Sequence, residues 1–366
     1  MSECGVDLQC IAGILRSAIH ELPNARDKVA EVINSLPENL LNDIINNEVN
    51  PEDLKRLCEV EPPLIKAFAL IKPYKIINKE VAQCMALALL DVGKYDEAAA
   101  LVERAIELSP NANDISYLRA LLSIVHAGSL VPKAENLHLS NEHETEEELI
   151  MKAARDYVNA ANIYEAINEH MHAELARFNA LDLLAKHYFI HGNLDDALKQ
   201  YARCMTIIKD EGITKICKSM VMLIDAIMSG SPKKYITAGD ELMNNDMPQY
   251  ALLAYGSAYQ LNNDPYTYIK YITALINYVD NKIKEEYGSF MNLLTNIRAA
   301  GIKSIADHMG IPDDALLKYL EAKAALESSG EPSALIKYLA NDEEITRIVK
   351  NTLSKWLNQE NHLQHA

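Results

Sequence analysis

The sequence predicts an all-α protein, an α-solenoid of helical hairpins that ends in a helix-turn-helix or degenerate winged-helix module. Ala, Leu, Ile, Lys and Glu dominate its 366 residues, and this composition favours helices. The alternation of β-branched and aromatic residues that is typical of strands is almost absent. Small residues and glycines recur as helical hairpins need them, at the contacts between helices and at the turns.

Residues 1–139 form the first predicted domain, a set of helical repeats. Over about 1–75, apolar residues recur at the period of a helix. Asn50 and Pro51 fit the N-cap and the first position of one of these helices, because an N-cap side chain accepts a backbone hydrogen bond and the first position needs no backbone N–H.

The segment Lys79–Ala112 contains the clearest single hairpin. Ala86 is the small residue of its first helix, Gly93 makes the turn, and Ala98 is a small contact of its second helix. The segment is similar to a tetratricopeptide repeat, a 34-residue helical hairpin. It departs from that pattern at Ala82, where an aromatic residue is frequent.

A second domain is predicted over 149–284, and its hairpin Leu181–Tyr201 has the same design. Ala185 provides the small contact, and Gly192 provides the turn, where a residue free to adopt positive φ is favoured. Before this domain, the acidic segment 140–148 is expected to be a solvated linker, because runs of like charge repel and rarely pack. A helix start is the alternative for that segment.

The third predicted domain, 285–366, holds a short helix, a turn and a second helix within Ile302–Ala325. Gly310 ends the first helix and Pro312 begins the next, an arrangement typical of a helix-turn-helix. The alternating strands of a wing cannot be read in the residues that follow. A last helix with apolar residues at helical spacing carries Trp356.

A set of residues in the middle of the chain carries a family resemblance. These residues are Ala185, His187, Tyr188, Gly192, Leu194, Ala197, Leu198, Lys199, Tyr201, Arg203, Lys215, Cys217 and Met220. Through them, 181–243 resembles the domain shared by signalosome subunit 1 and the proteasome lid subunit Rpn-seven, which are PCI-domain subunits. A looser likeness covers 150–360, and members of that family carry a helical solenoid, a winged helix and a terminal helix.

The resemblance implies a non-catalytic scaffold subunit of a multiprotein complex, signalosome-like or proteasome-lid-like, in regulation of the ubiquitin pathway and cullin deneddylation. Its partners would be the other protein subunits of a hetero-oligomer. The main alternative is a tetratricopeptide-type adaptor in vesicle trafficking or in another protein–protein interaction role. A third class, an enzyme with an unrecognised site, has no group of residues in its favour.

Charge and composition weigh against several kinds of partner. The net charge of −17 argues against nucleic acid, because a phosphate-binding surface is basic. The N-terminus lacks a secretory signal, and no uninterrupted apolar stretch reaches the ~18–20 residues that span a membrane. The spacing of the six cysteines suggests no disulfide framework, so we expect reduced, mostly buried thiols. We therefore expect a cytoplasmic or nuclear protein without a membrane or small-molecule partner.

No motif predicts catalysis, a cofactor or a metal. His170 and His172 have the H-x-H spacing of the zinc site in the catalytic subunits of the signalosome and the lid, which also uses an aspartate. The position of that aspartate holds Leu183 here, and residues two apart on a helix diverge by about 200°. We therefore expect the two histidines at a surface or an interface. The phosphate-loop, nucleophile-elbow and HExxH motifs are also absent from the sequence.

Candidate contact residues lie on the second hairpin and toward the C-terminus. They are His187, Tyr188, His191, Lys199, Tyr201, Arg203, Tyr259 and Trp356. For the two histidines, a packed or solvent-facing position is the simpler interpretation. The tyrosines within 255–278 are expected mainly in the core, with an interaction stripe as the alternative, because aromatic residues with a polar tip suit interfaces.

Overall fold

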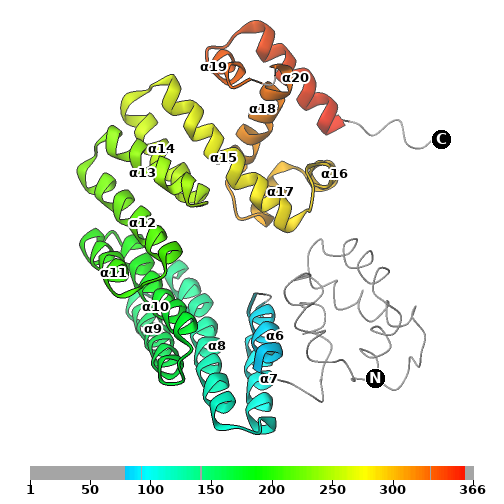
Figure 1. Ribbon diagram of the computed structural model, residues 1–366. Coiled ribbons are helices and arrows are strands. Elements are labelled where there is room, and N and C mark those ends of the chain that lie inside the picture. Colours follow the sequence, from blue (N-terminus) through cyan, green and yellow to red (C-terminus); the bar gives the residue numbers. More distant parts are fainter. Residues whose placement is uncertain (1–78, 92, 141, 330, 359–366) are drawn as a thin grey trace, which may run out of the picture. The chain divides into compact units, whose positions relative to one another are not determined.

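The computed structural model describes residues 79–91, 93–140, 142–329 and 331–358 (Figure 1). These residues form fifteen α-helices and contain no strand, which confirms the all-α prediction for this part of the chain. The helices are labelled α6 to α20, and those that are consecutive in sequence pack together in pairs, as in an α-solenoid. The helix predicted to start at Asn50 and Pro51 lies outside the described residues.

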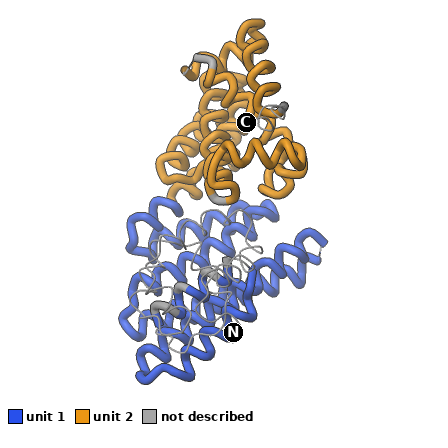
Figure 2. Tube along the Cα trace, turned by 90° about the vertical axis from the view of Figure 1, so that its right-hand side faces the viewer, with its two compact units in different colours: residues 1–217 blue, residues 218–366 orange. Residues whose placement is uncertain are grey.

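The chain divides into two compact units, residues 1–217 and 218–366 (Figure 2). The boundary falls within helix α12 (Glu211–Ser229), inside the segment 149–284 that the sequence suggested as one domain. No boundary separates the predicted first and second domains, because the helices on either side of 140–148 pack along each other.

Unit 1, residues 1–217, owes its hairpins to small residues and to turns with positive φ. Its described helices before α12 are α6 (Lys79–Asp91), α7 (Tyr95–Leu108), α8 (Ala112–Leu139), α9 (His143–Ala166), α10 (His170–Ile190) and α11 (Leu194–Ile207). Gly93 and Gly192 make the turns after α6 and α10 with φ of 74° and 73°, as predicted. Ala86, Ala98 and Ala185 are fully buried, so the expected small contacts lie in the core.

The acidic segment is not a linker in the described residues. Helix α9 begins at His143 and runs through Glu148, so the expected solvated linker is wrong there and the alternative, a helix start, is correct. Glu146 is buried in this first turn. Its carboxylate has histidine partners, which is why a charged residue can leave water at this position.

Helix α8 is long and apolar enough to cross a membrane by length and composition alone. It is the one such helix among the described residues. Its apolar run is interrupted by Asp114, Arg119 and Lys133, so the expectation of no uninterrupted apolar stretch of that length still holds for this helix. Tyr117, Leu121 and Val125 of α8 are buried, and the helix packs against α7 and α9. These contacts are those of a core helix in a helical protein.

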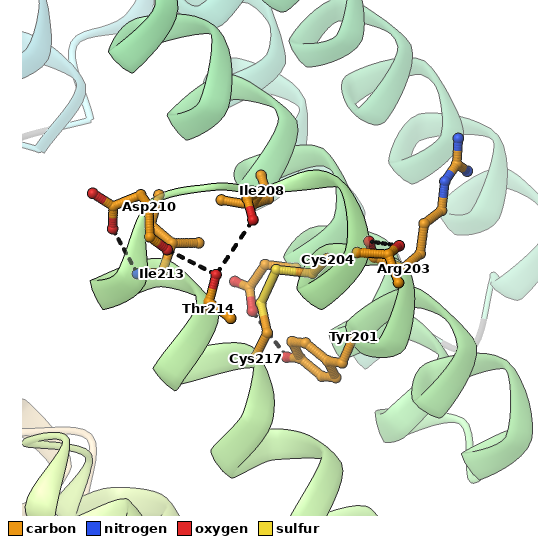
Figure 3. The surroundings of a disulfide bond; sticks show 10 residues. Tyr201, Arg203, Cys204, Ile208, Asp210, Ile213, Thr214 and Cys217 are labelled. Atoms are coloured by element: carbon orange, nitrogen blue, oxygen red, sulfur yellow. Dashed lines mark hydrogen bonds between the residues drawn. A yellow bond between two sulfur atoms is a disulfide. The ribbon is translucent and has the colours of Figure 1, made fainter.

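A disulfide joins Cys204 of α11 to Cys217 of α12 (Figure 3). The expectation of reduced thiols is therefore wrong for these two residues. The intervening turn places the two sulfurs together: Asp210 accepts a hydrogen bond from the Ile213 N–H at 2.8 Å, and the Thr214 hydroxyl donates to the Asp210 carbonyl at 2.8 Å. Sequence spacing could not indicate this pairing, because it depends on how the turn folds back.

Unit 2, residues 218–366, is helical in its described residues, and the helices from Pro265 onward share one hydrophobic core. After the end of α12 these are α13 (Pro232–Asn244), α14 (Pro248–Asn262), α15 (Pro265–Glu286), α16 (Phe290–Ala300), α17 (Ile302–His308), α18 (Asp313–Ser329), α19 (Ser333–Leu339) and α20 (Glu343–Asn358). Three of them begin with proline, whose missing N–H costs nothing at a first helical position. The core contains Leu293, Leu294, Leu316 and Leu320.

The predicted short helix, turn and second helix are present as α17 and α18, with Gly310 at φ 62° between them. The wing is not found in the described residues of 285–366, where helix α19 follows α18 and no strand occurs. The residues described here therefore supply no sheet for the subunit-to-subunit assembly that the family resemblance implied.

Loss of the disulfide should destabilise unit 1. Cys204 and Cys217 are 13 residues apart, and closing a loop of about this size contributes ~3 kcal/mol. We expect the double variant Cys204→Ala and Cys217→Ala to lose about that much free energy of unfolding, measured by urea denaturation without reductant. The same variant titrated with reductant is the control for the other cysteines. Equal stability of wild type and variant would contradict the prediction.

Glycine at position 239 is required by a tyrosine ring. A Cβ at Gly239 would lie 2.5 Å from Cε1 of Tyr255, whose ring is buried and whose hydroxyl donates a hydrogen bond to Asp240. We expect Gly239→Ala to lower the free energy of unfolding of unit 2 by about 1–3 kcal/mol in urea denaturation. The matched control is Gly256→Ala, whose Cβ would lie 3.3 Å from the ring of Tyr271. A smaller loss for Gly239→Ala than for the control would show that the Tyr255 ring moves freely.

Candidate functional site

Four histidines surround one glutamate where three helices of unit 1 meet. His138 lies in the last turn of α8, and Glu146 in the first turn of α9. His187 lies in the last turn of α10, and His191 is its C-cap residue. The fourth histidine, His143, is the first residue of α9.

Helix length brings these residues together. Helix α9 has 24 residues and α10 has 21, so at a rise of ~1.5 Å per residue they are ~36 and ~32 Å long. The two helices pack against each other and are joined by a short turn at Asn168, which has φ 63°. Because they are nearly equal in length, the end of α10 returns to the level at which α9 begins. Residues about 45 positions apart, such as Glu146 and His191, therefore become neighbours.

The carboxylate of Glu146 is the centre of the cluster. Its Oε2 lies 3.2 Å from Nδ1 of His138 and 3.2 Å from Nδ1 of His143. Its Oε1 lies 2.9 Å from Nε2 of His191 and 3.3 Å from Nδ1 of His187. Since a carboxylate only accepts hydrogen bonds, the imidazoles of His138, His143 and His191 donate. Both oxygens are thus in contact with ring nitrogens.

Burial and hydrogen bonding act on the Glu146 carboxyl in opposite directions. The residue is only 5% exposed, and burial raises its pKa because it disfavours the charged form. Hydrogen bonds from His191, His143 and His138 outweigh burial and lower the pKa to about 2. The carboxylate is therefore held in its charged form.

Helix ends add to this electrostatic pattern. Glu146 lies at the N-terminus of α9, where the helix dipole favours a negative charge. His138 and His187 lie at the C-termini of α8 and α10, where it favours a positive one. The helix dipoles thus favour a negative charge at Glu146 and positive charge at the surrounding histidines.

A cavity of about 590 Å³ adjoins the cluster. Its walls come from α8, α9 and α10, which lie side by side in Figure 1. Apolar side chains such as Val131, Ile150 and Leu183 line it together with His138 and Glu146. The remaining lining residues are Ala134, Glu135, Leu139, Tyr157, Asn179, Asp182, Lys186, His187 and Ile190.

The structure brings two of the predicted contact residues together. The ring centroids of His187 and His191 lie 4.6 Å apart in the cluster, with the rings tilted by 59°, and the ring centroid of Tyr188 lies 5.8 Å from that of His187. Lys199 is exposed and forms an ion pair with Asp196. Thus the hairpin contributes one grouped pair of histidines and one isolated surface lysine.

The other candidates on the hairpin have unequal exposure. Arg203 is exposed, and Figure 3 shows its side chain directed away from the disulfide. Tyr201 is fully buried, and its hydroxyl donates to Oδ1 of Asp182 at 2.9 Å. Tyr201 therefore packs the hairpin and offers no side-chain surface to a partner, which corrects its assignment as a contact residue.

In unit 2, the aromatic candidates pack against neighbouring rings. The ring of Tyr259 lies 5.2 Å from Tyr268, and Trp356 lies 5.2 Å from Phe290 at the edge of the core. Of the tyrosine stripe, Tyr255 is buried and Tyr268, Tyr271 and Tyr278 are partly buried, whereas Tyr266 is exposed. Most of these side chains fill the space between helices.

The pair His170 and His172 does not converge. Nδ1 of His170 lies 2.9 Å from Oε1 of Glu165, whereas Nε2 of His172 lies 3.1 Å from the hydroxyl of Tyr117. The two imidazoles have different partners, as the helical geometry of their spacing requires.

Sequence reasoning missed His138, His143 and Glu146. A local signal was present, since His143 and Glu146 are three residues apart and His187 and His191 are four apart, and both spacings place side chains on one helix face. That the two pairs meet depends on how α9 and α10 pack, which no local spacing encodes.

Comparisons of this chain with protein-family models and with curated protein sequences found no match. Function is therefore inferred from the residues and their geometry.

The buried hydrogen bond of Tyr201 gives a stability prediction. Tyr201→Phe removes the donor to Asp182, whose Oδ2 keeps its ion pair with Lys186 at 2.6 Å. We expect a loss of about 1 kcal/mol in the free energy of unfolding of unit 1, measured in urea. The control is Tyr188→Phe, at a partly exposed position on the same hairpin. Equal effects of the two variants would mean that the Asp182 bond contributes nothing.

Proposed function

We propose that this protein is a non-catalytic helical scaffold that binds another protein through the cavity between α8, α9 and α10. The observation that carries this proposal is a pair of exposed aliphatic side chains beside the cavity. Leu139 is 80% exposed and Ile190 is 64% exposed, and both line it. Leaving such side chains in water forgoes the free energy of their burial, which a partner would recover.

The composition of the cavity suits a protein segment with an apolar anchor. Val131, Ile150 and Leu183 form apolar walls, and Glu135 and Lys186 add charges of both signs. Protein interfaces commonly combine an apolar centre with a polar rim. A solenoid of hairpins also offers such a surface on rigid helices, so little order has to be gained on binding.

The more specific proposal follows the family resemblance of 181–243. It makes the protein a signalosome-like or proteasome-lid-like subunit in the ubiquitin pathway. Because the described part of 285–366 is helical, its subunit contacts would run through helix faces and not through a wing sheet. That same helical C-terminal region favours the second candidate, a tetratricopeptide-type adaptor in vesicle trafficking.

The test is affinity purification of the tagged full chain from its native cells at native salt, followed by size-exclusion chromatography and mass spectrometry. We expect a stoichiometric set of co-eluting proteins. The variants Leu139→Ser and Ile190→Ser should reduce their recovery by about tenfold or more, because a packed aliphatic anchor is worth at least ~1.4 kcal/mol. Met171→Ser, another highly exposed residue of unit 1, is the control and should retain them.

The outcomes separate the alternatives. Lid or signalosome subunits in the eluate support the specific proposal, and membrane-fusion proteins support the adaptor. A monomeric elution profile with no co-purified protein contradicts the scaffold function, and equal loss with Met171→Ser contradicts the role of the cavity.

A further inference from the structure

We infer that His138, His143, Glu146 and His191 form a zinc site that ties the turn between α8 and α9 to the end of α10. The inference does not depend on the proposed protein binding. The four proposed ligands come from the ends of three consecutive helices of unit 1, α8, α9 and α10.

The donor set fits zinc. One ligand atom from each of the four residues lies within 4.8 Å of the others. At Zn–N and Zn–O distances of ~2.0–2.2 Å, tetrahedral ligand atoms are ~3.3–3.6 Å apart. His138 and His143 are each 3.2 Å from Oε2 of Glu146, and His191 is 2.9 Å from Oε1, so zinc binding would require the carboxylate and the imidazoles to adjust around one ion.

The imidazole rings already converge. The ring centroids of His138, His143 and His191 lie 5.1–5.8 Å from one another, and each pair is tilted or edge-to-face. One carboxylate can be satisfied by fewer donors, so hydrogen bonding to Glu146 does not by itself explain why three imidazoles converge on it. A zinc ion among them would replace these hydrogen bonds: each facing ring nitrogen would give up its proton to the solvent or to the other ring nitrogen and coordinate through its lone pair. Imidazoles with a carboxylate select zinc over calcium or magnesium.

A fifth residue supplies an independent observation. The side chain of His187 is only 9% exposed, and its Nδ1 makes no hydrogen bond although it lies 3.3 Å from Oε1 of Glu146. Ligating carboxylates are commonly oriented by a hydrogen bond from an outer residue. A slight turn of the Glu146 carboxylate toward a metal would satisfy this buried nitrogen. His187 is thus a positioning residue for the site.

The arrangement is that of a closed, structural site. Four protein ligands complete a tetrahedron and leave no position for a reacting water. Ions can reach the site from solvent, since the side chain of His143 is 52% exposed. Bound zinc would fix the end of α10 against the start of α9, and with it the wall of the cavity that His138 and Glu146 line.

The test uses the purified full chain, stripped of metal with a chelator and dialysed. Titration with zinc against a chromogenic competitor should give one ion per chain. Cobalt should give the visible absorption of a tetrahedral nitrogen–oxygen site without a thiolate charge-transfer band, which excludes the cysteines as ligands. The thermal midpoint of unfolding should rise with zinc and fall again with chelator, because zinc binds the folded state.

Single substitutions locate the site. His143→Ala and His191→Ala should each weaken zinc binding by more than about tenfold, because losing even an outer-shell partner costs tenfold to a hundredfold. His126→Ala is the matched control, an exposed histidine of α8 outside the cluster. Far-UV circular dichroism without metal shows whether each variant is folded, and His143, being half exposed, is the variant least able to disturb the core.

The following results would overturn the inference. They are the absence of stoichiometric zinc binding by the folded wild-type chain, a cobalt spectrum with thiolate bands, and equal zinc affinity of folded His143→Ala and His126→Ala. Saturable binding that is lost in both ligand variants and kept in the control supports it.

Discussion

The close approach of neighbouring helices through alanine is the constraint on which unit 1 depends. Ala98, Ala153 and Ala185 are fully buried, and buried alanines recur in each of the described helices α6 to α11. A side chain of one carbon lets two helix backbones come near each other. The ends of neighbouring helices of similar length can then lie side by side. A larger residue at these positions would separate the helices and move apart the groups that their ends bring together, including the four histidines around Glu146.

Polar anchors of one kind recur in both units. In each, a buried tyrosine hydroxyl donates to an aspartate that also pairs with a lysine. The three sets are Tyr201, Asp182 and Lys186; Tyr255, Asp240 and Lys270; and Tyr319, Asp280 and Lys323. Burial raises the pKa of Tyr255 and Tyr319, and the neighbouring aspartates raise it further. The hydroxyls therefore stay protonated and can donate. Each bond links two helices, and no buried tyrosine hydroxyl of these sets is left unpaired.

The histidine cluster and the cavity share walls but use different physical chemistry. The cluster depends on a buried charge that is tolerated because several donors surround it. The cavity depends on apolar surface left uncovered at Leu139 and Ile190. Because Leu139 follows His138 and Ile190 precedes His191 in the chain, ordering of the cluster would also order the edge of the cavity.

The sequence by itself determined the helical class, the turn glycines and the small helix contacts, because these follow from local periodicity and backbone freedom. It did not determine the pairing of Cys204 with Cys217. Nor did it reveal that Glu146, in an acidic run expected to be solvated, is buried among histidines. Only the tertiary structure decided these features. They require residues from different helices to meet, and that meeting depends on the lengths and packing of whole helices, beyond the few residues over which local patterns act.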